Sequence, residues 1–184
     1  MKQIICCLIS VLLIGCTSMP SEFNTAEDAM EYITSPKNGF VREKILANNI
    51  KVKVQLFPAV LIQKTNNPDK ILYFNIQFSL NGHEVLAQLP SEEYGAYVQL
   101  FSFGMEKHIN IRTESGKEYP ATMVSYQPMY NTSRSNELLV VYNDEIPGEE
   151  NISLVINEFG LKLGKLDFIF DNSKLKYIPT INQF

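Results

Sequence analysis

Tryptophan is absent from this chain of 184 residues, and cysteine and histidine are rare. The three cysteines, Cys6, Cys7 and Cys16, all lie close to the amino terminus. Residues 17–184 therefore offer no cysteine for a disulfide, a thiolate metal site or a nucleophile. The two histidines, His83 and His108, lack the close spacing typical of zinc ligands, so we expect neither a metal nor a cofactor.

Positive charge is also scarce, because 16 Lys and Arg residues stand against 20 Asp and Glu residues, for a formal net charge of −4. No run of five or more basic residues compensates for this deficit locally. Proteins that bind polynucleotides depend on clustered Lys and Arg to neutralise phosphates. We therefore expect no nucleic-acid partner.

Common catalytic signatures are missing as well. The sequence contains no Gly-x-Ser-x-Gly elbow, no phosphate-binding P-loop and no Gly-x-Gly-x-x-Gly turn. The adjacent acids Glu92 and Glu93 fit the first turn of a helix, where negative charge interacts favourably with the helix dipole, better than a glycosidase pair. The sequence therefore favours a non-enzymatic protein, with an unrecognised hydrolase as the least favoured alternative.

An apolar segment follows the cationic start of the chain at Lys2. Residues 4–15 carry no charge and number 12, which matches the hydrophobic region of a signal peptide. A helix that spans a bilayer needs about 20 such residues, so this segment is too short to cross. It predicts export from the cytoplasm and ends in the motif Leu13-Ile14-Gly15-Cys16.

This motif resembles the lipobox of bacterial lipoproteins, with Leu13 at −3, Ile14 at −2, Gly15 at −1 and Cys16 as the first mature residue. The resemblance implies cleavage after Gly15 and a diacylglyceryl group on the Cys16 thiol, usually joined by an acyl chain on the new amino group. Two or three chains hold a protein at a membrane almost permanently. The alternative is an ordinary cleaved signal in which Cys16 is incidental.

Thr17 stands at the second mature position, where an aspartate would imply retention at the inner membrane. The resemblance therefore implies an outer-membrane lipoprotein of the cell envelope that faces the periplasm or the cell surface. Residues 1–15 are expected to be removed, and residues 16–24 to form the lipidated cysteine and a tether. The remainder, 25–184, also resembles small uncharacterised Gram-negative envelope lipoproteins that join an amino-terminal helix to a β-rich body.

Residues 25–184 are expected to form a single, mainly β domain. Apolar residues at helical spacing predict a helix over 25–33, and a second short helix near 91–103 with Ser91 as its cap. Two-residue alternation and turn signals elsewhere predict an antiparallel β-sandwich of about 8–9 strands. The expected strands are 40–46, 50–56, 72–80, 83–88, 106–113, 118–126, 137–142, 151–159 and 166–170, after which 172–184 packs along an edge.

One predicted loop, residues 126–134, is rich in the residue types that protein interfaces favour. Tyr126, Met129, Tyr130 and Arg134 are the candidate partner-binding residues. In the alternative, Tyr126 ends a strand, Met129 and Tyr130 cap one end of the core, and the polar residues of the loop face water. The leading hypothesis is a lipid-anchored protein that docks on another envelope protein as an assembly, secretion-associated or immunity-type accessory. The alternative is a surface lipoprotein that binds an external ligand such as a glycan, a reading weakened by the absence of Trp.

Replacing Cys16 tests the anchor directly. We expect Cys16→Ala to move the protein from the membrane fraction to the soluble fraction, or to leave an uncut precursor, because the thiol is the site of lipid attachment. Fractionation and intact mass measure the outcome. Cys7→Ala is the matched control, since Cys7 leaves with the signal. Membrane association and mass that are unchanged in Cys16→Ala would refute the lipoprotein interpretation.

Overall fold

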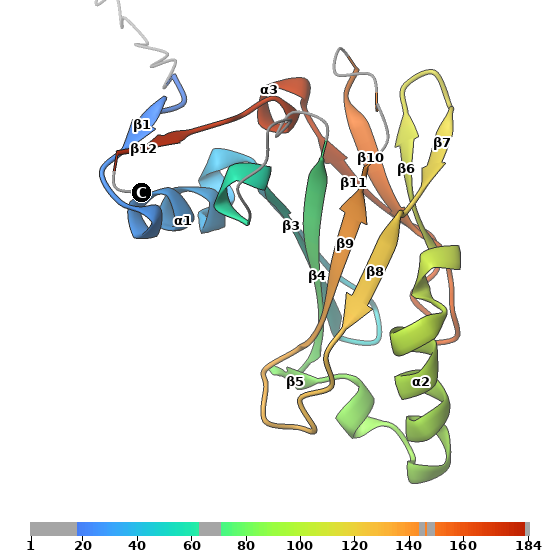
Figure 1. Cartoon of the computed structure of the whole chain (residues 1–184). Coiled ribbons are helices and arrows are strands. Elements are labelled where there is room, and N and C mark those ends of the chain that lie inside the picture. The colour runs from blue at the N-terminus through green and yellow to red at the C-terminus, as the bar shows by residue number, and fades with distance from the viewer. Residues whose placement is uncertain (1–17, 63–70, 144–145, 147–149, 183–184) are drawn as a thin grey trace, which may run out of the picture.

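The computed structural model describes residues 18–62, 71–143, 146 and 150–182. Within these residues the chain is mainly β, with three sheets of six, four and two strands and three helices (Figure 1). The expectation of a mainly β fold with an amino-terminal helix is therefore confirmed. Every strand pair in the two larger sheets is antiparallel.

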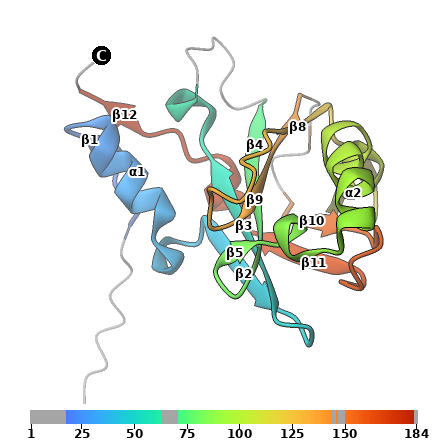
Figure 2. The same cartoon turned by 90° about the horizontal axis from the view of Figure 1, so that it is seen from below.

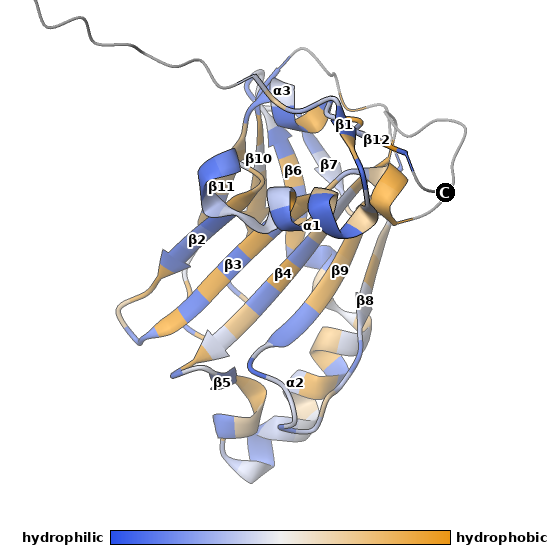
Figure 3. Cartoon of the chain, turned by 90° about the vertical axis from the view of Figure 1, so that its left-hand side faces the viewer, coloured by the Kyte–Doolittle hydropathy of each residue, from blue (hydrophilic) through white to orange (hydrophobic). Residues whose placement is uncertain are grey.

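The six-stranded sheet has the order β2-β3-β4-β9-β8, with β5 also paired to β4. Its longest strands alternate apolar and polar residues, which places one dry and one wet face on the sheet. This alternation is visible as bands along the strands in Figure 3. The strands are β2 (Val41–Ile45), β3 (Ile50–Phe57), β4 (Leu72–Leu80), β5 (His83–Glu84), β8 (Met123–Tyr126) and β9 (Asn136–Tyr142).

The four-stranded sheet has the order β11-β10-β6-β7. Its inner strands have the same alternation, because Ile109 and Ile111 lie in register with Ile156 and Leu154 and all four are buried. The strands are β6 (Ile109–Thr113), β7 (Glu118–Pro120), β10 (Ile152–Ile156) and β11 (Leu166–Phe170).

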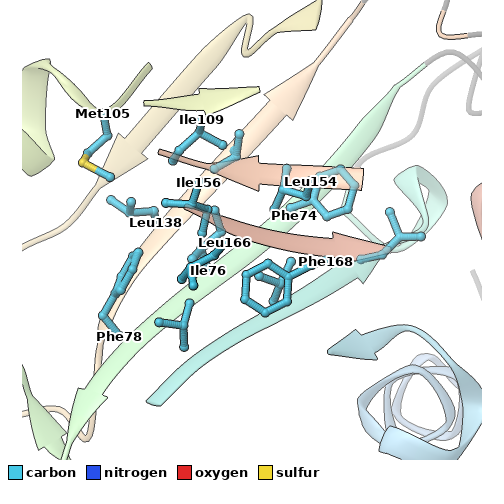
Figure 4. Packing of buried hydrophobic residues seen from close by; sticks show 14 of the residues in the cluster. Phe74, Ile76, Phe78, Met105, Ile109, Leu138, Leu154, Ile156, Leu166 and Phe168 are labelled. Atoms are coloured by element: carbon cyan, nitrogen blue, oxygen red, sulfur yellow. The ribbon is translucent and has the colours of Figure 1, made fainter. Parts of the chain in front are cut away.

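One hydrophobic core joins the two sheets. Buried side chains from both of them belong to a single cluster and point toward one another in Figure 4. Phe74 of β4 meets Phe170 of β11 edge-on, with 5.4 Å between the ring centroids. At the β2–β11 seam, the Nε of Arg42 donates to the carbonyl of Ile169 at 2.8 Å, and its guanidinium lies over Phe170. These contacts hold the two sheets together at that edge.

The helices follow the sequence pattern closely. In α1 (Ala26–Thr34), the Thr25 side chain caps the first turn by accepting from the Asp28 amide at 3.1 Å. The helix crosses the outer face of the six-stranded sheet (Figure 3), and α2 (Ser91–Phe103) lies on the other side of the molecule beside β8 (Figure 2). The cap prediction for α2 is wrong, because Ser91 already lies inside the helix and Pro90 precedes it without a capping side chain.

Four expected strands differ from the structure, and two of them are only shortened: the one expected at 106–113 begins at Ile109, after a 3-10 turn over Met105–Lys107, and the one expected at 151–159 ends at Ile156. The strand predicted at 83–88 ends after Glu84, where a 3-10 turn over Leu86–Gln88 replaces it. The strand predicted at 118–126 is divided, so that β7 joins the four-stranded sheet and β8 the six-stranded sheet. Pro120 ends β7 because it has no amide hydrogen for a further ladder bond. This division, together with two short strands near the ends of the described chain, brings the count to twelve strands in the described residues.

The two ends of the described chain are paired with each other. β1 (Glu22–Phe23) lies parallel to β12 (Thr180–Ile181), which follows the short helix α3 (Asn172–Leu175). The sequence places Phe23 in a tether and expects 172–184 to pack along an edge of the fold. In the structure Phe23 is part of the folded body, because its pairing with Ile181 is a contact between remote segments that local patterning does not reveal.

One exposed carboxylate organises the loop between β10 and β11. Glu158 accepts hydrogen bonds from the amides of Phe159, Gly160 and Lys162 at Oε1 and from Gly164 at Oε2, over 2.6–3.1 Å. Partial burial acts to raise the pKa of this carboxyl, but the four amides outweigh it and hold the pKa below its usual value.

This arrangement predicts an acid-sensitive contribution to stability. Because folding lowers the Glu158 pKa, the contribution is present above the ordinary glutamate pKa and is lost as the pH falls through the lowered value. We expect Glu158→Gln to lower the melting temperature at neutral pH and to flatten its decline below about pH 5. Thermal melts over a pH series measure this. Glu118→Gln, at an exposed glutamate of β7, is the control, and identical pH profiles for both variants and the wild type would contradict the assignment.

Candidate functional site

A buried polar cluster holds the loop between β8 and β9 in place, and it consists of Glu84, Asn136 and Tyr126. Glu84 is 1% exposed, and its carboxylate accepts from the Ser133 amide at 3.0 Å and from the Asn136 side chain at 3.1 Å. Asn136 also accepts from the Leu86 amide at 2.9 Å and donates to the Tyr126 hydroxyl at 3.1 Å. Each polar group thereby has a partner, which is the condition for a buried polar network to rigidify its surroundings.

Tyr126 links this cluster to the core. Its ring meets Phe101 of α2 edge-on, with 5.3 Å between the ring centroids. Burial raises the pKa of the phenol to about 12, with smaller increases from the nearby Glu84, Tyr94 and Tyr130, and the Asn136 hydrogen bond acts in the opposite direction. Tyr126 is therefore a neutral packing residue at physiological pH, and it is the last residue of β8.

The tip of the loop is strained and exposed. Tyr130 and Asn131 have φ values of 51° and 65°, in the left-handed region that costs a residue with a side chain roughly 1–2 kcal/mol. A hydrogen bond of 3.0 Å from the Thr132 amide to the Met129 carbonyl closes this turn. The Tyr130 side chain is 73% exposed, and that of Met129 is 44% exposed. Strain held at an exposed aromatic residue is typical of a functional loop.

Tyr130 borders a hollow next to the start of α2, which we call the tyrosine hollow. Its volume is about 330 Å³. Tyr94 of α2 lines it together with Tyr130, so two aromatic rings from remote parts of the chain share one depression. The other lining residues are Ala87, Leu89, Ser91 and Asn131.

The remaining predicted loop residue lies elsewhere. Arg134 lines a separate trough of about 640 Å³ on the outer face of the six-stranded sheet, with Lys51, Lys53 and Gln77 among its neighbours. The Lys51 ammonium in that trough is paired with Glu43 at 2.9 Å. The structure therefore places Tyr126 in the buried polar cluster, Tyr130 at the tyrosine hollow and Arg134 on another face.

Sequence reasoning missed Glu84, Asn136 and Tyr94 as parts of this site. Tyr94 fits the apolar stripe of its helix, and no local pattern indicates that Tyr130 lies across from it. Glu84 gives no local signal either, because it follows the polar turn of Asn81, Gly82 and His83 and only precedes the apolar Val85 and Leu86. Charged residues are almost never fully buried unless they have partners, and the partners of Glu84 come from a remote part of the chain.

The motif Leu13-Ile14-Gly15-Cys16 that resembles a lipobox lies outside the described residues, as do residues 144–145 and 147–149. In the described part of the chain, no helix has the length and apolar character needed to span a bilayer. Over the same residues, no group of three His, Cys, Asp or Glu side chains is placed to hold a metal ion. His83 is exposed, and His108 lies against the Phe159 ring.

Comparison with protein-family models, with curated proteins and with solved structures finds no match.

The buried polar cluster predicts a large cost for removing its central amide. Asn136→Ala deprives the Glu84 carboxylate, the Leu86 amide and the Tyr126 hydroxyl of a partner. We expect the free energy of unfolding to fall by about 2–4 kcal/mol, because buried polar groups would lose their hydrogen bonds. Denaturant titration measures this.

Asn75→Ala is the matched control for this experiment. Asn75 also donates to a glutamate, Glu137, but on the exposed face of the sheet at 3.1 Å. Its replacement is expected to cost no more than about 1 kcal/mol. Equal losses of unfolding free energy for the two variants would show that burial does not increase the contribution of the Asn136 hydrogen bonds to stability.

Proposed function

We propose that this chain is a lipid-anchored protein of the cell envelope that docks on another envelope protein through the tyrosine hollow. The Cys16 thiol carries the lipid, cleavage after Gly15 in the motif that begins with Leu13 and Ile14 makes Cys16 the first residue, and the body stands at the outer membrane. The protein acts by binding and not by catalysis, as an assembly, secretion-associated or immunity-type accessory. The resemblance of the amino terminus to bacterial lipoproteins supports the anchor.

The observation that carries the docking proposal is the state of Tyr130. Its ring is 73% exposed although its backbone is strained, and the loop that carries it is tied to a buried carboxylate. A tyrosine offers a large contact area and a hydroxyl, and it loses little side-chain freedom when it binds. A loop that is already fixed pays less of the ordering entropy of association. These are properties of an interface anchor.

The scaffold supports the same proposal. We take the six- and four-stranded sheets, which contribute to a single core, as the two layers of an antiparallel β-sandwich. Binding loops are commonly carried at the end of such a rigid scaffold. The tyrosine hollow lies at one end of the strands, where the β8–β9 loop and the start of α2 meet (Figure 1).

Glycan binding is the second candidate, and one observation favours it. Tyr94 and Tyr130 line the same hollow with the polar side chains of Ser91 and Asn131, a combination of aromatic surface and hydrogen-bonding groups that also suits a sugar. The absence of Trp from the chain weighs against this candidate.

The docking proposal predicts a loss of binding without a loss of folding. A photo-crosslinking residue at Ser91, in lipidated protein in intact envelopes, is expected to give a discrete protein adduct. We expect Tyr130→Ala to reduce this adduct severalfold, because the interface anchor is removed, while the melting temperature stays within a few degrees of the wild type. The double variant Tyr130→Ala with Arg134→Ala should lose no more than the single one, since Arg134 lies on another face.

Phe103→Ala is the matched control, because Phe103 is a 79% exposed aromatic residue that does not line the tyrosine hollow. An adduct that is unaffected by Tyr130→Ala would contradict the docking proposal, and a large drop in melting temperature would assign Tyr130 to the core. Binding of envelope or external glycans that depends on Tyr130, without a protein adduct, would favour the second candidate.

A further inference from the structure

Four aromatic rings fasten the two ends of the described chain to the body, and we call them the aromatic clamp. They are Phe23 of β1, Tyr32 of α1, Phe40 before β2 and Tyr177 after α3. Tyr177 is central, with its ring centroid 5.1 Å from that of Phe40 and 5.9 Å from that of Tyr32. Phe23 packs on Tyr32 at 5.6 Å. Phe40 is fully buried and Tyr177 is 7% exposed, so the clamp is continuous with the core.

Hydrogen bonds continue the clamp toward the amino terminus. The Tyr177 hydroxyl donates to the carbonyl of Pro20 at 2.9 Å. The amide of Thr180 donates to the Ser21 carbonyl at 2.9 Å, and that of Asn182 to the Phe23 carbonyl at 3.0 Å. Met19 packs against the hydrophobic core. The body is therefore in contact with the chain from Met19 onward.

This contact leaves very little chain between the body and the anchor. Cys16 and Met19 are three residues apart, and three residues reach at most about 11 Å when fully extended. A tether of this length is much shorter than the body, so it cannot let the domain turn freely above a membrane. The end of the body that carries the clamp must stay close to the lipid.

We infer that the end formed by β1, α1, α3 and β12 rests against the bilayer that holds the Cys16 lipid, with the tyrosine hollow directed away from it. The inference relies on the proposed function for the anchor itself. Figure 1 shows the two features at opposite ends of the molecule, with β1, β12 and α3 at one end and the β8–β9 loop at the other. The docking partner therefore approaches from the aqueous side.

The surface at the clamp end indicates which part faces the lipid headgroups. Exposed Lys176 and Ile178, which is 45% exposed, lie between α3 and β12 and combine a cation with apolar surface. The exposed side of α1 instead carries three acids, Glu27, Asp28 and Glu31, against the single Glu22 of β1, so anionic headgroups repel α1 more strongly. The α3–β12 side is therefore the part that meets the headgroups, and α1 lies beside it.

Energy transfer from two labelled positions tests this orientation. Single cysteines are introduced as Lys176→Cys at the clamp end and Glu92→Cys in the first turn of α2, and each carries a donor dye. No cysteine other than the lipidated Cys16 remains in the mature chain to compete for the dye. Lipidated protein is reconstituted into phosphatidylethanolamine–phosphatidylglycerol vesicles with acceptor dyes on a fraction of the headgroups. We expect transfer from position 176 to exceed that from position 92 severalfold.

A tether variant separates the short tether from other causes. A flexible Gly-Ser repeat of about a dozen residues, inserted between Thr17 and Ser18, leaves the clamp and the body unchanged but removes the length limit. The two positions should then transfer with similar efficiency. Unchanged thermal melts of all variants establish that the body is folded.

The outcomes distinguish the orientation from the anchor. Equal transfer from the two positions in lipidated protein overturns the orientation and leaves the anchor intact. A difference that persists after the insertion overturns the short tether as its cause. Vesicle flotation and intact mass on the same sample report whether the lipid is attached. Protein that carries no lipid contradicts the proposed anchor, independently of the energy-transfer result.

Discussion

The structure depends on one packing constraint, namely the burial of the apolar faces of two antiparallel sheets against each other. Strands β3, β4, β9, β10 and β11 all contribute residues to the same core. A strand that turns one face to this core must alternate apolar and polar residues, and a slip of one residue would expose the whole apolar set. Register is therefore fixed along the sheets, and the loops at their ends have fixed positions. The tyrosine hollow and the aromatic clamp both rely on this precision.

The buried polar cluster shows how hydrogen bonds to buried side chains hold an exposed loop in place. Burying the Glu84 carboxylate costs free energy unless hydrogen bonds replace its water. Asn136 and the Ser133 amide provide them, and Ser133 belongs to the loop itself. Displacing the loop would therefore leave a buried charge short of a donor, which costs more than the bond contributes on average. Because displacing the loop would cost this free energy, the loop keeps the left-handed backbone conformation of Tyr130 and Asn131.

Periodicity predicts the parts of the fold in which local sequence and tertiary environment agree. The strand expected at 72–80 and the helix near 91–103 have the bounds of β4 and α2, because their alternation or spacing is unbroken. Periodicity does not predict the parts of the fold that depend on a contact between residues remote in sequence. Three features depend on a partner that lies far away in the sequence. They are the change of sheet between β7 and β8, the pairing of Phe23 with Ile181 and the burial of Glu84. For the same reason the loop at 126–134 could be singled out by composition, whereas the separation of Tyr130 from Arg134 could not.

The clamp and the hollow have complementary consequences for docking. A lipid anchor confines a protein to a thin layer above the membrane, and a short tether confines its orientation as well. On the proposed orientation, a partner in the same membrane meets the hollow at a nearly constant height. The partner reaches the hollow by lateral diffusion and has few orientations to search. Effective concentration falls as a linker lengthens beyond the distance that it must span. On the proposed anchor and orientation, fastening Pro20 and Phe23 to the body favours partners that present their contact surface at the height of the domain, and disfavours those close to the headgroups.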